Sequence, residues 1–293
     1  MKKISAWVLA LLLLGGISVR SEKLKFEEKE EIQKTLEFAD PSKAGEVQVD
    51  NILGSITLEG TEAADVRLFV KKTIKARTED RIQKAKQEVE LEINTEGNLI
   101  DLFVDGPFRC KDDRKKGKEW RDPGYEVHFD FDIKVPRRCD ITLKTVTSGD
   151  IVVKNIEGVF EVHNVNGKIT MNHIAGDGEA HTVNGWVKVD FTRNPVSECS
   201  FKTINGDIEI GFQDGLAADF RLKTFNGDAL SDFPVSYLPG RAATEKKEKG
   251  RYVYKSDRFV GVKVGKGGPE IKMDTLNGDL LITKTKNRKE NLS

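Results

Sequence analysis

The sequence predicts an all-β protein, a β-solenoid or β-roll built from repeats of about 20 residues. First, a short phrase with an Asn-Gly pair recurs along the chain, as in HTVNGWVKV, KTINGDIEI and DTLNGDLLI. Second, apolar residues lie two and four positions after the glycine, and this period of two indicates a β-strand. Third, a unit with two short strands buries only one face, so neighbouring units must stack to form a core. A twisted meander or β-sandwich with the Asn-Gly turns along one rim is the alternative.

The repeat glycines predict where the chain turns. They follow one another at intervals of 18, 18, 21, 21 and 51 residues, starting from Gly149 in a related Ser-Gly pair. Asn and Gly adopt positive φ most easily, so each pair predicts a tight turn between two strands. Six stacked units would form a column about 25–30 Å long. The predicted turn residues are Gly149, Asn166, Gly167, Asn184, Gly185, Asn205, Gly206, Asn226, Gly227, Asn277 and Gly278.

The chain before the repeats divides into a targeting segment and a β region. Residues 1–21 have the form of a secretory signal peptide: two lysines, a short apolar run, small residues and then a charged start. An uncleaved N-terminal anchor is the alternative, and no second long apolar stretch follows. Residues 22–108 are predicted as an N-terminal β region that includes a hairpin at residues 96–98. The apolar spacing within EDRIQKAKQEV predicts a short helix over residues 79–89, whereas residues 22–45 suit a frayed helix or a first strand.

The remaining segments are a charged insertion, the repeats and a tail. Residues 109–125 form the insertion, and residues 126–285 form a β-repeat region continuous with the N-terminal part. The 51-residue interval contains a charged excursion from Tyr237 to Gly268, predicted to include an exposed loop tip and an added strand or hairpin. Residues 286–293 are predicted to be a disordered tail.

Composition excludes several classes of protein. The 48 basic residues balance the 48 acidic residues, which removes the electrostatic basis for binding nucleic acid. Three cysteines cannot form a disulfide scaffold. In an oxidising compartment Cys110 and Cys139 are the first pair to test, although three unpaired thiols remain an equal alternative. Cys199 lies in an alternating pattern that is typical of a strand, which predicts a small core residue.

The repeats resemble a known family. The phrases SFKTINGDIEIGF, LKTFNGDALSDFP and VGKGGPEIKMDTLNGDLLI, with the opening VQVDNILGSITLEGTEAADVRLFVKKT, are similar to the DUF4097 family over roughly residues 30 to 285. This is a family of bacterial β-strand-repeat proteins with an adhesin-like label. The resemblance implies an exported or envelope-associated β-solenoid with no assigned chemistry. The insertion with Cys110 and Cys139 departs from the family pattern.

The sequence contains no established catalytic motif. It lacks a Gly-x-Ser-x-Gly elbow, a His-Glu-x-x-His pair, a Walker loop and a Cys-x-x-Cys pair. The glycines at positions 261, 265, 267 and 268 indicate a turn, because no Ser or Thr follows Lys266 as a phosphate loop requires. We therefore predict a protein without cofactors.

Two rows of side chains are the candidates for a metal. His163 and His181 each lie four residues before a repeat glycine, so stacking would place them about 5 Å apart. Two imidazoles at that distance could share a metal ion, with His173 or Asp177 approaching as a third ligand. Asp207 and Asp228 follow successive repeat glycines and would be neighbours, a pattern that could recruit calcium. Solvent-facing ladder residues and ordinary turn chemistry are the simpler interpretations, and we predict no bound metal.

The predicted function is therefore structural or adhesive. We expect an exported, non-catalytic β-repeat protein that acts in interaction, adhesion or structural support at the bacterial cell envelope, in the periplasm or at the cell surface. Its partner would be an envelope protein or a polysaccharide, with Trp186 as a contact residue, and a membrane would be involved only through an uncleaved signal segment. A carbohydrate-active β-helix enzyme of the lyase or hydrolase type is the alternative, since paired carboxylates on a β-helix can cleave polysaccharides.

Overall fold

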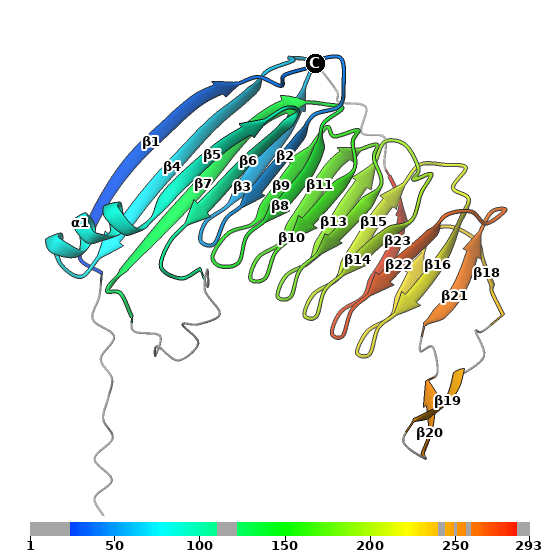
Figure 1. Cartoon of the computed structure of the whole chain (residues 1–293). Coiled ribbons are helices and arrows are strands. Elements are labelled where there is room, and N and C mark those ends of the chain that lie inside the picture. Colours follow the sequence, from blue (N-terminus) through cyan, green and yellow to red (C-terminus); the bar gives the residue numbers. More distant parts are fainter. Residues whose placement is uncertain (1–23, 110–121, 240–243, 249–250, 256–258, 286–293) are drawn as a thin grey trace, which may run out of the picture.

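The computed structural model describes residues 24–109, 122–239, 244–248, 251–255 and 259–285. It confirms the all-β prediction: two large open sheets, a separate hairpin and one helix account for the regular structure of the described residues (Figure 1). The predicted signal segment, Cys110, the C-terminal tail and most of the charged insertion lie outside the described residues.

Each sheet takes its strands from distant parts of the chain. Sheet A contains, in spatial order, β1 (Phe26–Leu36), β4 (Val66–Ala76), β7 (Tyr125–Pro136), β3 (Ile56–Thr61), β9 (Ile151–Lys154), β11 (Ile169–Ile174), β13 (Val187–Phe191), β15 (Ile208–Phe212), β23 (Leu280–Lys284) and β17 (Ala229–Ser231). Sheet B contains β18 (Val235–Tyr237), β21 (Val260–Val264), β16 (Ala218–Lys223), β22 (Glu270–Asp274), β14 (Cys199–Lys202), β12 (Gly178–His181), β10 (Phe160–His163), β8 (Asp140–Lys144), β2 (Glu46–Asp50), β6 (Leu99–Asp105) and β5 (Glu90–Glu96). The hairpin pairs β19 (Thr244–Glu248) with β20 (Arg251–Lys255).

The two sheets pack face to face, as in the sandwich alternative. Strands alternate buried and half-buried residues, which is why apolar side chains at every second position reach a shared core. Phe191 of sheet A lies 6.4 Å from Phe201 of sheet B, and Phe212 lies 5.7 Å from Phe220, between ring centroids. All four rings are fully buried. The aromatic pairs therefore join the sheets through the middle of the core.

The repeats alternate between the sheets. In each repeat unit a strand of sheet B is followed by a turn and then by a strand of sheet A, as β10 is followed by Asn166-Gly167 and β11. The two strands of a unit thus belong to different sheets and are not partners in one hairpin. Their partners are the equivalent strands of the adjacent units, in parallel and in register. The early, looser repeat behaves in the same way, since β2 pairs with β8 and β3 with β9.

The last unit of the sequence is not the last unit of the stack. Strand β22 lies between β14 and β16, and β23 lies between β15 and β17. In Figure 1 the red strands β22 and β23 accordingly interrupt the passage from yellow-green to yellow. The expectation that Asp207 and Asp228 are neighbours is therefore wrong, because the unit with Asp279 separates them.

A glycine-rich crossover makes this insertion sterically feasible. Strand β21 pairs with the outer side of β16 and β22 with its inner side, so residues 265–269 must cross the start of β16. A Cβ on Gly265 would lie 2.7 Å from the Leu216 carbonyl oxygen, and one on Gly268 would lie 2.5 Å from that of Ala217. The glycine cluster predicted as a turn is this crossover, where a side chain would collide with backbone.

The N-terminal end of the sandwich is closed by charged elements. Helix α1 (Glu79–Glu88) packs against β1, β4 and β7 with Ile82 and Ala85 buried, close to the predicted 79–89. Residues 26–36 form the edge strand β1, which decides between the two predicted alternatives in favour of a strand. Its sequence, FEEKEEIQKTL, contains four glutamates and two lysines, and such charges discourage further strand pairing at an edge. The predicted hairpin at 96–98 is confirmed as the connection between β5 and β6.

The two described cysteines are buried thiols. Cys139 and Cys199 are almost completely inaccessible, as predicted for Cys199, and burial raises the pKa of each thiol to about 12. Because a thiolate is the reactive form, we expect neither residue to react with iodoacetamide at pH 8 in the folded protein. Both should react after denaturation in guanidinium, as measured by peptide mass spectrometry. Labelling of either residue in the folded state would contradict this assignment.

Candidate functional site

The Asn-Gly turns form one rim of the sandwich and are held by an inner ladder. The hydroxyl of the threonine three residues before a repeat glycine donates to the glycine carbonyl of the adjacent unit, for example Thr203 to Gly185 at 2.8 Å and Thr275 to Gly206 at 3.0 Å. These threonines are buried, so the bonds satisfy polar groups that lack access to water. Asn164 has the same role through its side-chain amide, donating to the Gly149 carbonyl at 2.9 Å.

A second ladder runs through the asparagine side chains. Each amide nitrogen donates to the amide oxygen of the next unit at 2.6–2.7 Å, in the order Asn226, Asn277, Asn205, Asn184 and Asn166. Stacked amides of this kind stabilise parallel in-register strands. The position of Asn277 in this ladder again places the last unit inside the stack.

The aspartates after the repeat glycines bind backbone. The Oδ1 atom of Asp207 accepts the N–H of Asp279 at 2.9 Å, and that of Asp279 accepts the N–H of Asp228 at 2.8 Å. The Asp150 carboxylate accepts the N–H of Lys168 in the same way. Turn N–H groups therefore offset the negative charge along this row. The arrangement is that of a structural ladder, and no two of these carboxylates face one another across a cleft.

Beside the asparagine ladder lies a row of apolar side chains, here called the apolar ridge. Its members are Val146, Val165, Val183, Ile204, Leu276 and Phe225, and the backbone carbonyl of each of the first five accepts the Asn N–H of the next unit. Val165 and Val183 are half-buried, and exposure then increases toward one end of the ridge, from 39% at Ile204 through 47% at Leu276 to 72% at Phe225. At about 4.8 Å per unit, the ridge is about 24 Å long. The signal for the ridge is present in the sequence, since an apolar residue precedes every Asn-Gly pair, but the ridge was not among the predicted features.

Trp186 lies on the same rim and is 44% exposed. The Lys168 ammonium lies 3.9 Å from the centroid of its ring, in a cation–π contact. The lysine of the adjacent unit thus covers one face of the only tryptophan among the described residues, which reduces its value as a stacking platform for a sugar.

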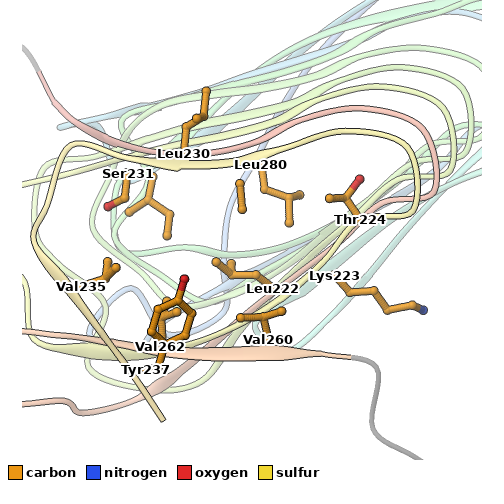
Figure 2. A pocket seen from close by; sticks show the side chains of 12 residues that line it. Leu222, Lys223, Thr224, Leu230, Ser231, Val235, Tyr237, Val260, Val262 and Leu280 are labelled. Atoms are coloured by element: carbon orange, nitrogen blue, oxygen red, sulfur yellow. The ribbon is translucent and has the colours of Figure 1, made fainter. Parts of the chain in front are cut away.

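The end of the sandwich opposite α1 is open. A cavity of about 310 Å³ lies between β17 and β23 on one side and β16, β18 and β21 on the other (Figure 2). Its wall is mainly aliphatic, with Leu222, Val262 and Leu280 among its residues. The edge strands β17 and β18 are exposed along their whole length and carry no charged side chain. Within the described residues, the edge strands of this end therefore lack the charged side chains found at β1, and Phe225 extends the apolar ridge to it.

The two candidate histidines meet on the outer face of sheet B. His163 and His181 are register partners on β10 and β12, and their ring centroids lie 5.3 Å apart. The Glu179 carboxylate lies between them, 3.3 Å from His163 Nε2 and 3.8 Å from His181 Nε2. Burial is the main cause that lowers the pKa of His181. The strands FEVH and GEAH each contain Glu-x-His, so the acidic and imidazole groups share a face of the sheet.

The expected third ligands do not join this pair. His173 lies at the end of β11 in sheet A and borders a separate pocket with Arg137 and Asn155. The Asp177 carboxylate accepts the N–H of Val196 at 2.9 Å. Glu179 occupies the position instead. The sequence signal for Glu179 is the period of two within a strand, whereas the predicted third ligands, His173 and Asp177, were expected to approach from a connecting loop.

Comparison with known proteins does not assign a family. No family model and no curated protein matches the chain, so the resemblance to DUF4097 remains a prediction. A solved structure of a candidate cell adhesion protein from Clostridium sporogenes is 13% identical, with a TM-score of 0.42 over 88% of this chain and 100% of that one. A candidate adhesin from Bacteroides fragilis is 12% identical (TM-score 0.33, 87% and 97%), and a candidate lipid-binding protein from Parabacteroides distasonis is 11% identical (TM-score 0.28, 88% and 97%).

In the described part of the chain, no helix combines the length and the apolar character that a membrane span requires.

Proposed function

We propose that this chain is an exported, non-catalytic β-repeat protein that binds a partner protein at the bacterial cell envelope through its turn rim. The apolar ridge is the observation that carries the proposal. Six units place an aliphatic or aromatic side chain in one line about 24 Å long, beside a row of side-chain amides. Contiguous exposed apolar surface with a polar border is characteristic of protein–protein interaction sites.

The chemistry of the ridge favours a protein over a polysaccharide. Five of its six side chains are aliphatic, and sugar-binding surfaces depend on aromatic faces and dense hydrogen-bonding groups. Trp186, the predicted contact residue, is partly covered by Lys168. The asparagine amides already bind one another along the ladder. An extended polypeptide with several apolar side chains would lie along such a line.

The solenoid interpretation belongs to this proposal as well. Parallel, in-register pairing of units that alternate between two sheets supports it, and such stacks present long, rigid surfaces to extended partners. Export rests on the signal-like residues 1–21.

Removal of the two most exposed side chains of the apolar ridge should strongly weaken binding of the partner protein. We expect the double variant Phe225→Ser, Leu276→Ser to lose most of its co-sedimentation with envelope fragments of the source bacterium, because both side chains are largely exposed and apolar. The matched control is Val159→Ser, Val196→Ser, which removes apolar side chains that are 59% and 75% exposed and outside the ridge. Protease treatment of the fragments should also abolish binding.

Three results would contradict the proposal: no co-sedimentation of the unmodified chain, equal loss in the control variant, or binding that survives protease treatment. The enzyme alternative predicts new reducing ends when the chain is incubated with a panel of polysaccharides. Turnover that disappears in Asp207→Asn or Asp228→Asn would favour that alternative instead.

A further inference from the structure

The histidine cluster of sheet B has the composition of a transition-metal site. One ligand atom from each of His163, Glu179 and His181 lies within 4.8 Å of the others, and this is the one such group of His, Cys, Asp and Glu side chains among the described residues. Two imidazoles with one carboxylate are a ligand set that suits Zn²⁺, and a hard cation such as Ca²⁺ would require more oxygen ligands.

The distances between the three side chains are somewhat longer than those of a four-coordinate site. With metal–ligand bonds of about 2.0–2.1 Å, neighbouring ligand atoms of a tetrahedral site lie about 3.3–3.4 Å apart. Glu179 Oε1 is 3.3 Å from His163 Nε2, and Glu179 Oε2 is 3.8 Å from His181 Nε2. Small rotations of side chains that are one-quarter to two-fifths exposed would bring all three atoms to one ion.

The backbone holds the three ligands in place. His163 and His181 are register partners on adjacent parallel strands, and Glu179 precedes His181 by two residues on the same face. The rigid sheet fixes their separation, which lowers the entropic cost of assembling the ligands. The Glu161 carboxylate, 3.1 Å from His163 Nε2, adds a second acidic group beside the cluster and is itself paired with Lys144 at 2.9 Å. Ser200 Oγ lies 3.1 Å from His181 Nε2.

We propose that His163, Glu179 and His181 form a binding site for a divalent transition-metal ion of the zinc class. The ion would bridge β10 and β12 and keep its remaining coordination position toward solvent. Neutral imidazoles are required as ligands, and each imidazole has one free electron pair for the ion. The site lies on the outer face of sheet B and is independent of the apolar ridge, so it can exist whether or not the ridge binds a partner.

The test is calorimetric titration of the full, tag-free chain with ZnCl₂ after dialysis against EDTA. We expect one site, with no comparable binding of CaCl₂ or MgCl₂. The variants His163→Gln, His181→Gln and Glu179→Gln should each weaken Zn²⁺ binding by about tenfold or more, since even partners outside the coordination sphere change affinity by that factor. The control His173→Gln changes an exposed histidine of sheet A and should bind as the unmodified chain does.

Two further readouts report on geometry and on folding. Co²⁺ substituted at the site should give the intense visible absorption of a four-coordinate ion. At one fixed Zn²⁺ concentration, the melting temperature of the unmodified chain and of His173→Gln should rise more than that of His163→Gln, because a ligand that binds only the folded state stabilises it in proportion to its affinity. Circular dichroism of each variant shows whether it is folded. We expect all of them to fold, because the three ligand residues lie on a solvent-facing surface.

The proposal is overturned if Zn²⁺ binds more weakly than about 1 mM. It is also overturned if the three ligand variants bind Zn²⁺ as tightly as the unmodified chain does, or if the unmodified chain binds Ca²⁺ as tightly as Zn²⁺. The weak visible absorption of six-coordinate Co²⁺ would overturn it as well. If one ligand variant does not fold, the remaining two decide the outcome by the same criteria.

Discussion

A chain that ends at Val264 is expected to lose its cooperative unfolding transition. The truncation removes β22 and β23, which lie inside the stack, between β14 and β16 and between β15 and β17. Four buried side chains are lost with them, Ile271, Met273, Leu280 and Ile282. At about 1.5–3 kcal/mol each, their burial amounts to about 6–12 kcal/mol, as large as the whole stability of a typical domain. Urea unfolding followed by circular dichroism would measure the effect.

The matched control for this truncation is a chain that ends at Thr285. It keeps every strand of both large sheets and should unfold at the same urea concentration as the full chain. Had the last unit been at the end of the stack, its removal would cost only one interface and leave the rest intact. A cooperative transition of nearly unchanged midpoint in the chain that ends at Val264 would therefore contradict the insertion of β22 and β23.

The substitution Gly206→Ala is expected to destabilise the fold by about 3 kcal/mol or more. Gly206 has φ of +152°, and a Cβ there would lie 2.1 Å from the Gly185 carbonyl oxygen of the adjacent unit. That oxygen also accepts the Thr203 hydroxyl, so it cannot move away without loss of the inner ladder. The added methyl group must therefore separate two units in the middle of the stack. The change in free energy of unfolding is measured by urea denaturation.

Gly215→Ala is the control that separates strain from collision. Gly215 has φ of +78°, yet no atom lies within 4 Å of the position of its Cβ. Its substitution should cost only the strain of a left-handed alanine, about 1–2 kcal/mol. Equal destabilisation by the two substitutions would show that contact between units does not limit the turn.

The sequence predicts those elements that depend on residues close together in the chain. The helix over 79–89, the hairpin at 96–98 and the alternating strands follow from residue spacing and turn chemistry, which depend on neighbours in the chain. The spacing of His163 and His181 from their glycines also predicted their contact, because units 18 residues apart pair in register. Glu179 was equally accessible through its place two residues before His181.

The order of the repeat units in the stack could not be predicted from the sequence in the same way. Asp207 and Asp228 follow successive repeat glycines in the sequence, yet Asp279 lies between them. Each unit has the same ladder chemistry, so Asn277 fits beside Asn205 as well as Asn226 would. Because the repeated pattern makes any two units compatible as neighbours, it does not predict which units are adjacent in the stack.

The sequence alone thus determined that the chain forms β-structure, where it turns and which side chains point inward, because these depend on periods of two and on Asn-Gly corners. The tertiary structure alone decided the order of the units, the closed and open ends, and the line of apolar side chains along the rim. Those features arise from pairing between residues far apart in the chain, such as Asn277 and Asn205, which are 72 residues apart, and from a crossover that only glycines at 265 and 268 can accommodate.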